Sequence, residues 1–357
     1  MSDPRPLTER GEPVLEVTDL VVTFPTDDGD VHAVGGLTFA VRENETLGIV
    51  GESGSGKSVT SMAILGLLPR TAKVTGSVKL HGRELIGLSE DEMRPLRGES
   101  MAMVFQDALT ALNPVFTVGD QISEAISIHH DLNNHDLKAR VIELLEIVGI
   151  PNPERRVGQY PHEYSGGMRQ RAMIAMSIAN DPAVLIADEP TTALDVTIQA
   201  QVLEVFERIQ ERTHSSVILI THDLGVVAGT ADRVLVMYAG REVELADVDP
   251  LFYNPRHPYT RGLLASLPRV DGTRLSRLNR IKGQPPSLIA IPSGCAFHPR
   301  CNDAHLPAPC ATERPELRSV EPRHRSACHF AEALPMLSTT DLAASGAEDE
   351  GSVAEIT

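Results

Sequence analysis

Residues 46–58 read TLGIVGESGSGKS, an apolar stretch followed by a turn rich in glycine and serine. The first five residues are typical of a short strand that is buried on both faces of a parallel sheet. The turn matches the pattern G-x-x-x-x-G-K-[ST] from Gly51 to Ser58. Its glycines let backbone N–H groups and the N-terminus of the next helix surround a chain of phosphates. The stretch therefore predicts a phosphate-binding loop (residues 51–58) between a central strand and a helix over about 57–68.

The parts of this loop have distinct expected roles toward a nucleotide. Lys57 reaches the β and γ phosphates, and the Ser58 hydroxyl can ligate Mg²⁺. The alternative is a Gly/Ser-rich connector, but the strand before the motif and the helix after it favour phosphate binding. The residues expected to bind ATP are Gly51, Ser53, Gly54, Ser55, Gly56, Lys57, Ser58 and Val59.

A second motif, VLIADEP at residues 184–190, is an apolar strand that ends in two carboxylates. Buried charge is costly without a partner, so we expect both acids to be used. Because side chains alternate along a strand, Asp188 and Glu189 point to different places. Asp188 can hold the Mg²⁺ shell while Glu189 polarises the attacking water. Such a pair alone is more often a solvated loop entry, but its place after a phosphate-binding loop predicts an ATPase.

A third motif, YSGGMRQR at residues 164–171, places Ser165, Gly166 and Gly167 at the start of a predicted helix. The free N–H groups of a helix N-terminus can take an anion. A simple helix cap is the alternative. One nucleotide does not need two such helix ends from a single chain, so the second is expected to serve a neighbouring subunit.

Together these motifs resemble the ATP-binding subunit of an ABC transporter. The resemblance also includes Gln106, the run TTALD, and His222 in ITHD, and it covers roughly residues 14–250 in the family's order. The family's LSGGQ signature is YSGGM here, so that Tyr164 and Met168 replace its ends while the phosphate-binding Ser and Gly positions remain.

The resemblance implies an α/β fold of the P-loop NTPase class, with a mainly parallel sheet, an antiparallel β subdomain and a helical subdomain at about 107–180. The alternation of apolar strands with helical spacing independently predicts a parallel-sheet core with a helical insertion. The expected divisions are a flexible N-terminus (1–13), the ATPase domain (14–250), a C-terminal extension (251–332) and a disordered acidic tail (333–357).

The resemblance also implies roles for single residues. Two such domains pair head to tail, so that the Ser-Gly-Gly turn binds the nucleotide of the other subunit and Asp195 lies at the seam. His222 contacts the γ-phosphate, and Gln106 senses Mg²⁺ and water. Phe24 stands where the family stacks an aromatic ring on adenine, although a core position for it is equally open. Taken alone, His222 is an ordinary polar strand end and Gln106 a solvated loop residue.

A narrower resemblance follows residue 250. The run NPRHPYTRGLLASLP and the earlier TTALDVTIQAQ are similar to the ATPases of oligopeptide and dipeptide importers. The expected partners are two transmembrane permease subunits, an extracytoplasmic peptide-binding protein, and a second ATPase that is either a relative or an identical chain. The alternatives are an importer for nickel or another small solute, and a soluble ABC ATPase that acts on nucleic acid or ribosomes.

Composition limits the partners. The 357-residue chain is 41% hydrophobic and 23% charged, which is ordinary for a globular protein. Its net charge of −17 argues against nucleic acid as a partner. No apolar run approaches the ~20 residues that cross a bilayer, and the polar start MSDPRPLTERGEPV lacks the apolar core of a signal peptide. We therefore expect a cytoplasmic protein, and the resemblance to an importer ATPase implies a peripheral position at the cytoplasmic face of the cell membrane, held there by other chains.

All four cysteines fall late in the chain, spaced C-x5-C-x8-C-x17-C in a Pro-rich segment with little periodicity. A cytoplasmic location disfavours disulfides, and scattered free thiols would not cluster in this way. Four thiolates suit either tetrahedral Zn²⁺ or a cubane iron–sulfur cluster. The four cysteines are Cys295, Cys301, Cys310 and Cys328. Nearby histidines that keep zinc open through mixed ligation are His298, His305, His324 and His329.

On the residues alone, zinc and an iron–sulfur cluster stay equally open. The peptide-importer ATPases can carry a 4Fe–4S cluster on this extension, so the resemblance implies a 4Fe–4S cluster on the four cysteines. Its expected role is to hold the C-terminal region together, far from the ATP chemistry.

Overall fold

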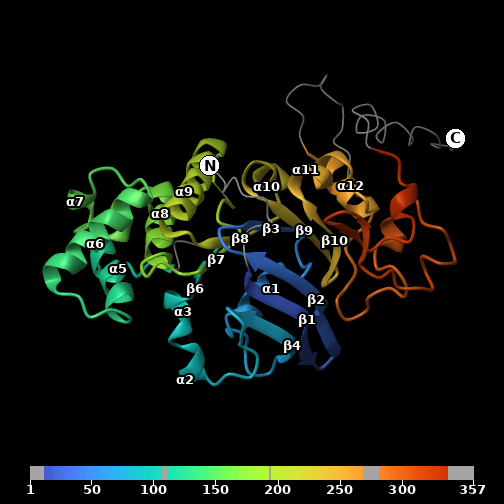
Figure 1. Ribbon diagram of the computed structural model, residues 1–357, viewed down its shortest axis with the longest axis horizontal. Helices are drawn as coiled ribbons and strands as arrows, with labels where there is room; N and C mark the ends of the chain where they lie inside the picture. Colours follow the sequence, from blue (N-terminus) through green and yellow to red (C-terminus); the bar gives the residue numbers. More distant parts are fainter. Residues whose placement is uncertain (1–11, 107–110, 193, 268–280, 337–357) are drawn as a thin grey trace, which may run out of the picture.

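The structure is a computed structural model, and it contains two β-sheets with helices around them (Figure 1). The expected flexible N-terminus and acidic tail lie almost wholly outside the residues that it describes. No helix in the described part of the chain is long and apolar enough to span a membrane. The described residues are 12–106, 111–192, 194–267 and 281–336.

A sheet of eight strands forms the centre of the molecule. Its strands in spatial order are β11 (Arg318–Glu321), β12 (His324–Ser326), β10 (Arg241–Asp247), β9 (Arg233–Tyr238), β3 (Thr46–Val50), β8 (Ser216–Thr221), β7 (Val184–Asp188) and β6 (Met101–Val104). The five strands from β9 to β6 run parallel, and the other three add an antiparallel edge. Strands β3, β7 and β8 are buried along their whole length, as their apolar runs predict.

A second, antiparallel sheet packs on one side of this core, as the sequence resemblance implied. Its strands in order are β2 (Gly29–Arg42), β1 (Pro13–Thr26), β4 (Lys73–Leu80) and β5 (Arg83–Glu84). Helix α1 (Lys57–Ile64) shares its apolar core with both sheets. It is shorter than predicted, because the chain turns at Gly66, which has a left-handed φ of 62°.

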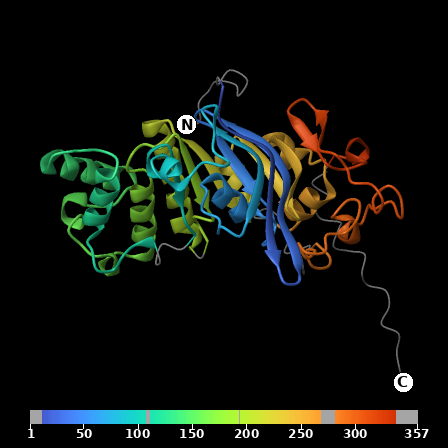
Figure 2. The ribbon, with the colours of Figure 1, turned by 90° about the horizontal axis from the view of Figure 1, so that it is seen from below.

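The helical region lies at one end of the molecule, opposite the C-terminal segment (Figures 1 and 2). Its apolar helix faces gather around Ile122, Leu144 and Ile174, all fully buried. Thr117 caps the first large helix by accepting a hydrogen bond from Asp120 N. Its helices are α5 (Val118–Ser127), α6 (Asn134–Ile147), α7 (Pro153–Arg156), the 3₁₀ turn η2 (Pro161–Glu163) and α8 (Gly166–Ser177), with α2 (Glu90–Met93) and α3 (Leu96–Glu99) leading to β6.

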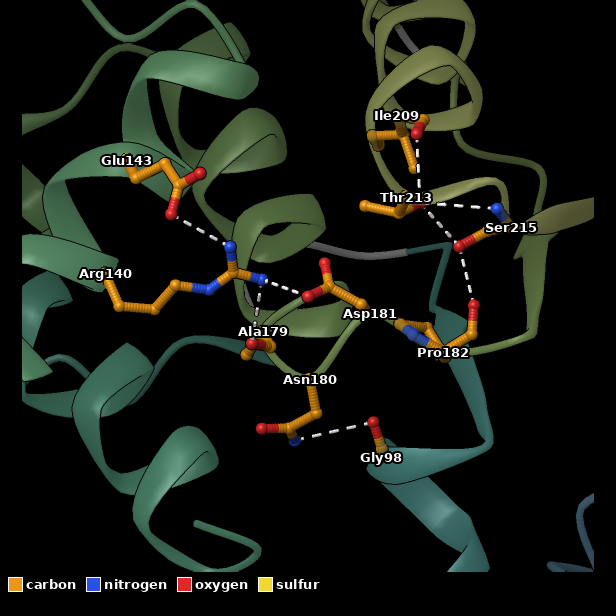
Figure 3. A network of polar contacts seen from close by, with 10 residues as sticks. All are labelled: Gly98, Arg140, Glu143, Ala179, Asn180, Asp181, Pro182, Ile209, Thr213 and Ser215. Carbon is orange, nitrogen blue, oxygen red and sulfur yellow. Dashed lines mark hydrogen bonds and ion pairs between the residues drawn. The ribbon is translucent and has the colours of Figure 1, made fainter. Parts of the chain in front are cut away.

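Polar contacts tie this region to the central sheet (Figure 3). Arg140 on α6 donates to Asp181 Oδ2 at 2.7 Å, in the loop that enters β7. Ser215, which follows α9 (Val196–Thr213), donates to Pro182 O at 2.6 Å in the same loop. Both the helical region and α9 therefore fix the start of the strand that ends in the two carboxylates.

The C-terminal segment joins the central sheet directly. Strand β12 pairs with β10, and β11 pairs with β12. The low periodicity of this segment predicted an irregular appendage, so these two strands were not expected. Three rings, Tyr238 of β9, Tyr259 of α12 and Phe297, pack with centroids 4.7–5.3 Å apart. The remaining elements are α10 (Leu224–Thr230), α11 (Val248–Tyr253), α12 (Pro258–Ala265) and the 3₁₀ turns η3 (His298–Arg300) and η4 (Ala331–Ala333).

Candidate nucleotide-binding site

The phosphate-binding loop opens into a cleft of about 610 Å³ at the carboxyl ends of β3, β7 and β8. In parallel sheets this edge is where ligands bind. The sequence-predicted Gln106, Glu189 and His222 line the cleft together with the loop. Leu263 of α12 also lines it, and no sequence motif predicted that position. Four separate predictions are therefore brought together at one site.

Two glycines are required by the shape of this loop. A Cβ at Gly51 would lie 2.3 Å from Met237 O, and one at Gly56 would lie 2.4 Å from Ala33 O. Gly56 also has a φ of 101°, in the region that favours glycine. The loop can wrap tightly around a ligand because the neighbouring backbone approaches it where side chains are absent.

Lys57 is buried within the loop at the start of α1. Its Nζ donates to Gly51 O at 2.7 Å and to Glu52 O at 3.1 Å. Burial lowers the pKa of Lys57, an effect that the carboxylates of Glu189, Asp188 and Glu52 oppose. The ammonium is thus held against the loop by carbonyl oxygens, and phosphate oxygens could replace them as stronger, charged acceptors.

The Asp188 carboxyl is hydrogen-bonded to Ser58, which lines the cleft. Asp188 ends β7 and is only 6% exposed, and burial raises the pKa of its carboxyl while a hydrogen bond with Ser58 lowers it. Its Oδ1 has no hydrogen-bond partner in the described part of the chain. An unsatisfied buried carboxylate oxygen beside a hydroxyl is the donor set that Mg²⁺ takes together with phosphates. These two residues fit the predicted Mg²⁺ site.

Glu189 is the centre of the polar groups in the cleft. Its Oε2 accepts hydrogen bonds from Gln106 Nε2 at 3.1 Å and from Thr192 Oγ1 at 2.8 Å, and His222 Nδ1 lies 3.4 Å away. The residue has a φ of 47°, a strained conformation that a non-glycine residue adopts at functional sites. Thr192 belongs to the quoted TTALD run, but the sequence assigned it no role. This arrangement aims one carboxylate into the cleft and can orient a water molecule.

Other predicted ligands lie outside this cleft. Ser165 caps α8 by accepting a hydrogen bond from Met168 N at 3.3 Å. A Cβ added at Gly166 would meet no atom of the described residues within 4 Å. Asp195 caps α9. The N-terminus of α8, with Gly167 in its first turn, therefore remains available to another chain, and its role in trans stays a prediction.

Phe24, the predicted adenine contact, also does not line the cleft. It lies on β1 opposite Val31 of β2 and packs, half-buried, against the apolar core below the antiparallel sheet. Its contact with adenine stays a prediction.

The C-terminal segment touches the phosphate-binding loop at Glu52. Tyr259 Oη accepts a hydrogen bond from Glu52 N at 2.8 Å. Arg300 forms two parallel hydrogen bonds with the Glu52 carboxylate, at 2.5 Å and 2.9 Å. Because Arg300 directly precedes Cys301, the expectation that the cysteine segment lies far from the ATP chemistry is wrong. The contact spans 248 residues of sequence, and no local pattern signals it.

All four cysteines line one small, mostly apolar cavity, together with Phe297, Phe330 and Leu334. None of them forms a disulfide. Burial raises the pKa of the Cys295 thiol. It raises the pKa of Cys301 to about 12 and that of Cys328 to about 11. Burial therefore favours the protonated form of Cys295, Cys301 and Cys328.

The histidines near the cysteines divide into two groups. His298 and His329 line the cavity, whereas His324 lies elsewhere, fully buried, with Nε2 2.7 Å from Glu244 Oε1. His305 stacks on Phe330. Within the described residues, no three His, Cys, Asp or Glu side chains are grouped as ligands of one metal ion.

Comparison with known families finds two matches along the chain. Residues 34–192 match the model described as ABC transporter, and residues 243–307 match the model described as oligopeptide/dipeptide transporter, C-terminal region. The first covers the loop, Gln106 and Glu189, and the second covers Tyr259 and Arg300.

Curated relatives support both matches. The Bacillus subtilis oligopeptide transport ATP-binding protein OppD is 54% identical over 286 residues, 80% of each chain. The B. subtilis dipeptide transport ATP-binding protein DppD is 54% identical over 81% of this chain and 87% of its own length. OppD of Mycobacterium tuberculosis is 52% identical over 92% of this chain, which spans about half (54%) of that longer relative.

Solved structures show the same fold. A dimeric bacterial ABC transporter cassette superposes with a TM-score of 0.59 at 24% identity, covering 66% of this chain and 98% of the cassette. A component of the CbiONQ ABC transporter complex of Clostridium perfringens superposes with a TM-score of 0.59 at 27% identity, covering 68% of this chain and 91% of its own.

Proposed function

Because the chain belongs to the family of ABC transporter ATP-binding proteins with an oligopeptide/dipeptide transporter C-terminal region, we propose that it is the ATP-hydrolysing subunit of a peptide importer. The observation that carries the proposal is the meeting of the phosphate-binding loop with Gln106, Glu189 and His222 in one cleft. The named functions of the relatives, oligopeptide and dipeptide transport, supply the substrate class.

Different residues of the site fit different roles in ATP hydrolysis. The loop N–H groups and Lys57 bind the phosphates, and Ser58 with Asp188 would hold Mg²⁺, which neutralises phosphate charge. Glu189 orients the attacking water and accepts its proton. Gln106 and His222 contact the same Glu189 oxygen, so they hold the carboxylate toward the bound nucleotide.

We place the complete hydrolytic site between two ATPase subunits. The open N-terminus of α8, starting at Ser165, would complete the site of the partner, and Asp195 would lie at the seam. The partner is a related ATPase or a second copy of this chain. Two transmembrane permeases and an extracytoplasmic peptide-binding protein complete the importer, which places this chain peripherally at the cytoplasmic face of the membrane.

We also propose that the four cysteines hold a 4Fe–4S cluster. Their convergence on one cavity and their freedom from disulfides support a thiolate-bound metal centre. The cavity itself is small, about 20 Å³, so the thiols would have to move apart to admit a cluster. Anaerobically purified protein should be brown, absorb near ~400 nm and contain about four irons per chain. Colourless protein with one stoichiometric zinc and no iron would overturn this assignment.

The proposed function is tested with the assembled importer in lipid vesicles. ATP hydrolysis should depend on Mg²⁺ and rise when a peptide-loaded binding protein is added. Stimulation by a nickel-loaded binding protein instead of a peptide-loaded one would reassign the substrate. Absence of ATP hydrolysis in an intact, correctly assembled complex would reject the function altogether.

A further inference from the structure

The N–H and the carboxylate of Glu52, the second residue of the phosphate-binding loop, are both held by the C-terminal half of the chain. Its N–H donates to Tyr259 Oη, and its carboxylate pairs with both terminal nitrogens of Arg300. Such a two-pronged pair fixes the orientation of the carboxylate as well as its position. The loop is therefore anchored from outside at the residue next to Gly51.

Arg300 is itself held rigidly. Its side chain is only 5% exposed. Its Nε donates to Lys282 O at 2.9 Å, and its guanidinium lies over the rings of Tyr238 and Phe297, 5.8 Å and 6.0 Å from their centroids. Phe297 lines the cysteine cavity, and Cys301 follows Arg300 in sequence. The packing around the cysteines thus fixes the cation that holds Glu52.

The Arg300–Glu52 pair also determines the net charge beside the phosphate site. Glu52 lines the cleft, and its carbonyl oxygen accepts a hydrogen bond from the Lys57 ammonium at 3.1 Å. Without Arg300, a carboxylate would stand unneutralised beside the incoming triphosphate, and the loop would lose its outer anchor. Both effects weaken binding, whereas neither removes a group that takes part in hydrolysis.

We propose that Arg300 is a positioning residue that holds the phosphate-binding loop in its nucleotide-binding form through Glu52, with Tyr259 as a second support. The segment that carries the cysteines is thereby part of the nucleotide site, and its packing sets the affinity for ATP. This inference rests on the proposed function only in taking ATP as the ligand of the loop.

The test measures the Kd of MgATP by calorimetry, and the melting temperature, on the full chain. Arg300→Met should weaken MgATP binding about tenfold, because a desolvated charge pair loses one partner. Glu52→Gln should weaken MgATP binding less, by about threefold, because the amide oxygen still accepts one hydrogen bond from Arg300 while the second bond and the charge pair are lost. In the Glu52→Gln background, Arg300→Met should weaken binding several-fold less than it does in the unaltered chain, which marks direct coupling.

Tyr259→Phe removes only the hydroxyl and should weaken binding about threefold; it keeps the test decisive if Arg300→Met does not fold. The matched control is Arg323→Met, which breaks the 2.7 Å pair with Asp247 at the far end of β10 and should leave the Kd unchanged. An equal effect of Arg300→Met in both Glu52 backgrounds, or a lowered melting temperature with an unchanged Kd for both Arg300→Met and Tyr259→Phe, would overturn the inference. Lys57→Ala separates the two proposals: if it too leaves the Kd unchanged, the nucleotide site itself is misassigned.

Discussion

The nucleotide cleft and the cysteine cavity differ in their origin and in their chemistry: residues from Gly51 to Leu263 line the cleft, whereas residues 257–334 alone line the cavity. The cleft gathers charge: Lys57 and Glu189 line it, and the carboxylates of Glu189 and Asp188 both act on the Lys57 ammonium. The cavity is mostly apolar, and burial there raises the pKa of the Cys301 and Cys328 thiols and favours protonated sulfur. The charged groups of the cleft are therefore in place before a ligand arrives, whereas a metal at the cysteine cavity, as proposed above, would first have to displace protons from the thiols.

The largest effect is expected at the cleft. Lys57→Ala removes the buried cation, so hydrolysis by the assembled importer should fall by about 100-fold or more and MgATP binding should weaken. Steady-state phosphate release measures the first, and calorimetry measures the second. Lys79→Ala, an exposed lysine on β4, is the matched control and should behave as the unaltered chain. Unchanged turnover in Lys57→Ala would show that the loop does not bind the reacting phosphates.

Glu189→Gln should separate binding from chemistry. It preserves the volume and the contacts with Gln106 but removes the base, so that turnover drops about 100-fold while MgATP binds and holds the ATPase dimer closed. Size-exclusion chromatography with ATP checks closure, and Glu146→Gln on the exposed face of α6 is the control. Near-normal hydrolysis by Glu189→Gln would place the base elsewhere.

Ser165→Arg should disable the complex but spare the subunit. A long cation at the N-terminus of α8 blocks the approach of the partner's phosphates, while the cleft of the same chain keeps its residues. MgATP binding by the isolated chain should be unchanged, and peptide uptake by vesicles should be lost. Ser165→Ala, which removes only the hydroxyl, should reduce uptake less. Full uptake by Ser165→Arg would contradict the shared site.

The smallest effect is expected at the thiols of metal-free protein. Because burial raises the pKa of Cys301 and Cys328 to about 12 and 11, their thiolate fraction at pH 8 is small. Alkylation by iodoacetamide should be slower than that of glutathione by on the order of 100-fold and should speed up as pH rises toward the pKa. Mass spectrometry measures the rate for each cysteine. Rates equal to that of glutathione would mean that the thiols are not buried.

The sequence predicts the nucleotide cleft better than it predicts the C-terminal segment. The loop, Asp188 and Glu189 could be predicted from the sequence because each sits at the end of a recognisable apolar strand, whereas Gln106 and His222 were predicted only from the resemblance to ABC transporter ATPases. Strand and helix periodicity predicted the parallel-sheet core and its helical insertion, whereas the antiparallel sheet was predicted only from the family resemblance.

The contacts of the C-terminal segment with the loop and the central sheet could not be predicted from strand or helix periodicity. Arg300 meets Glu52 only because η3 and the loop are brought together by the packing of Tyr238 and Phe297. Strand β12 has only three residues, too short for a periodic signal, and its place is set by pairing with β10. Contacts of this kind depend on tertiary packing, and residue spacing does not encode them.

The most direct measurement is an experimental structure of the full chain with Mg²⁺ and a non-hydrolysable ATP analogue. The account predicts phosphates inside the loop 51–58, Mg²⁺ beside Ser58 and Asp188, and the Arg300–Glu52 pair intact behind them. Phosphates bound elsewhere, or bound in the loop with that pair separated, would contradict it.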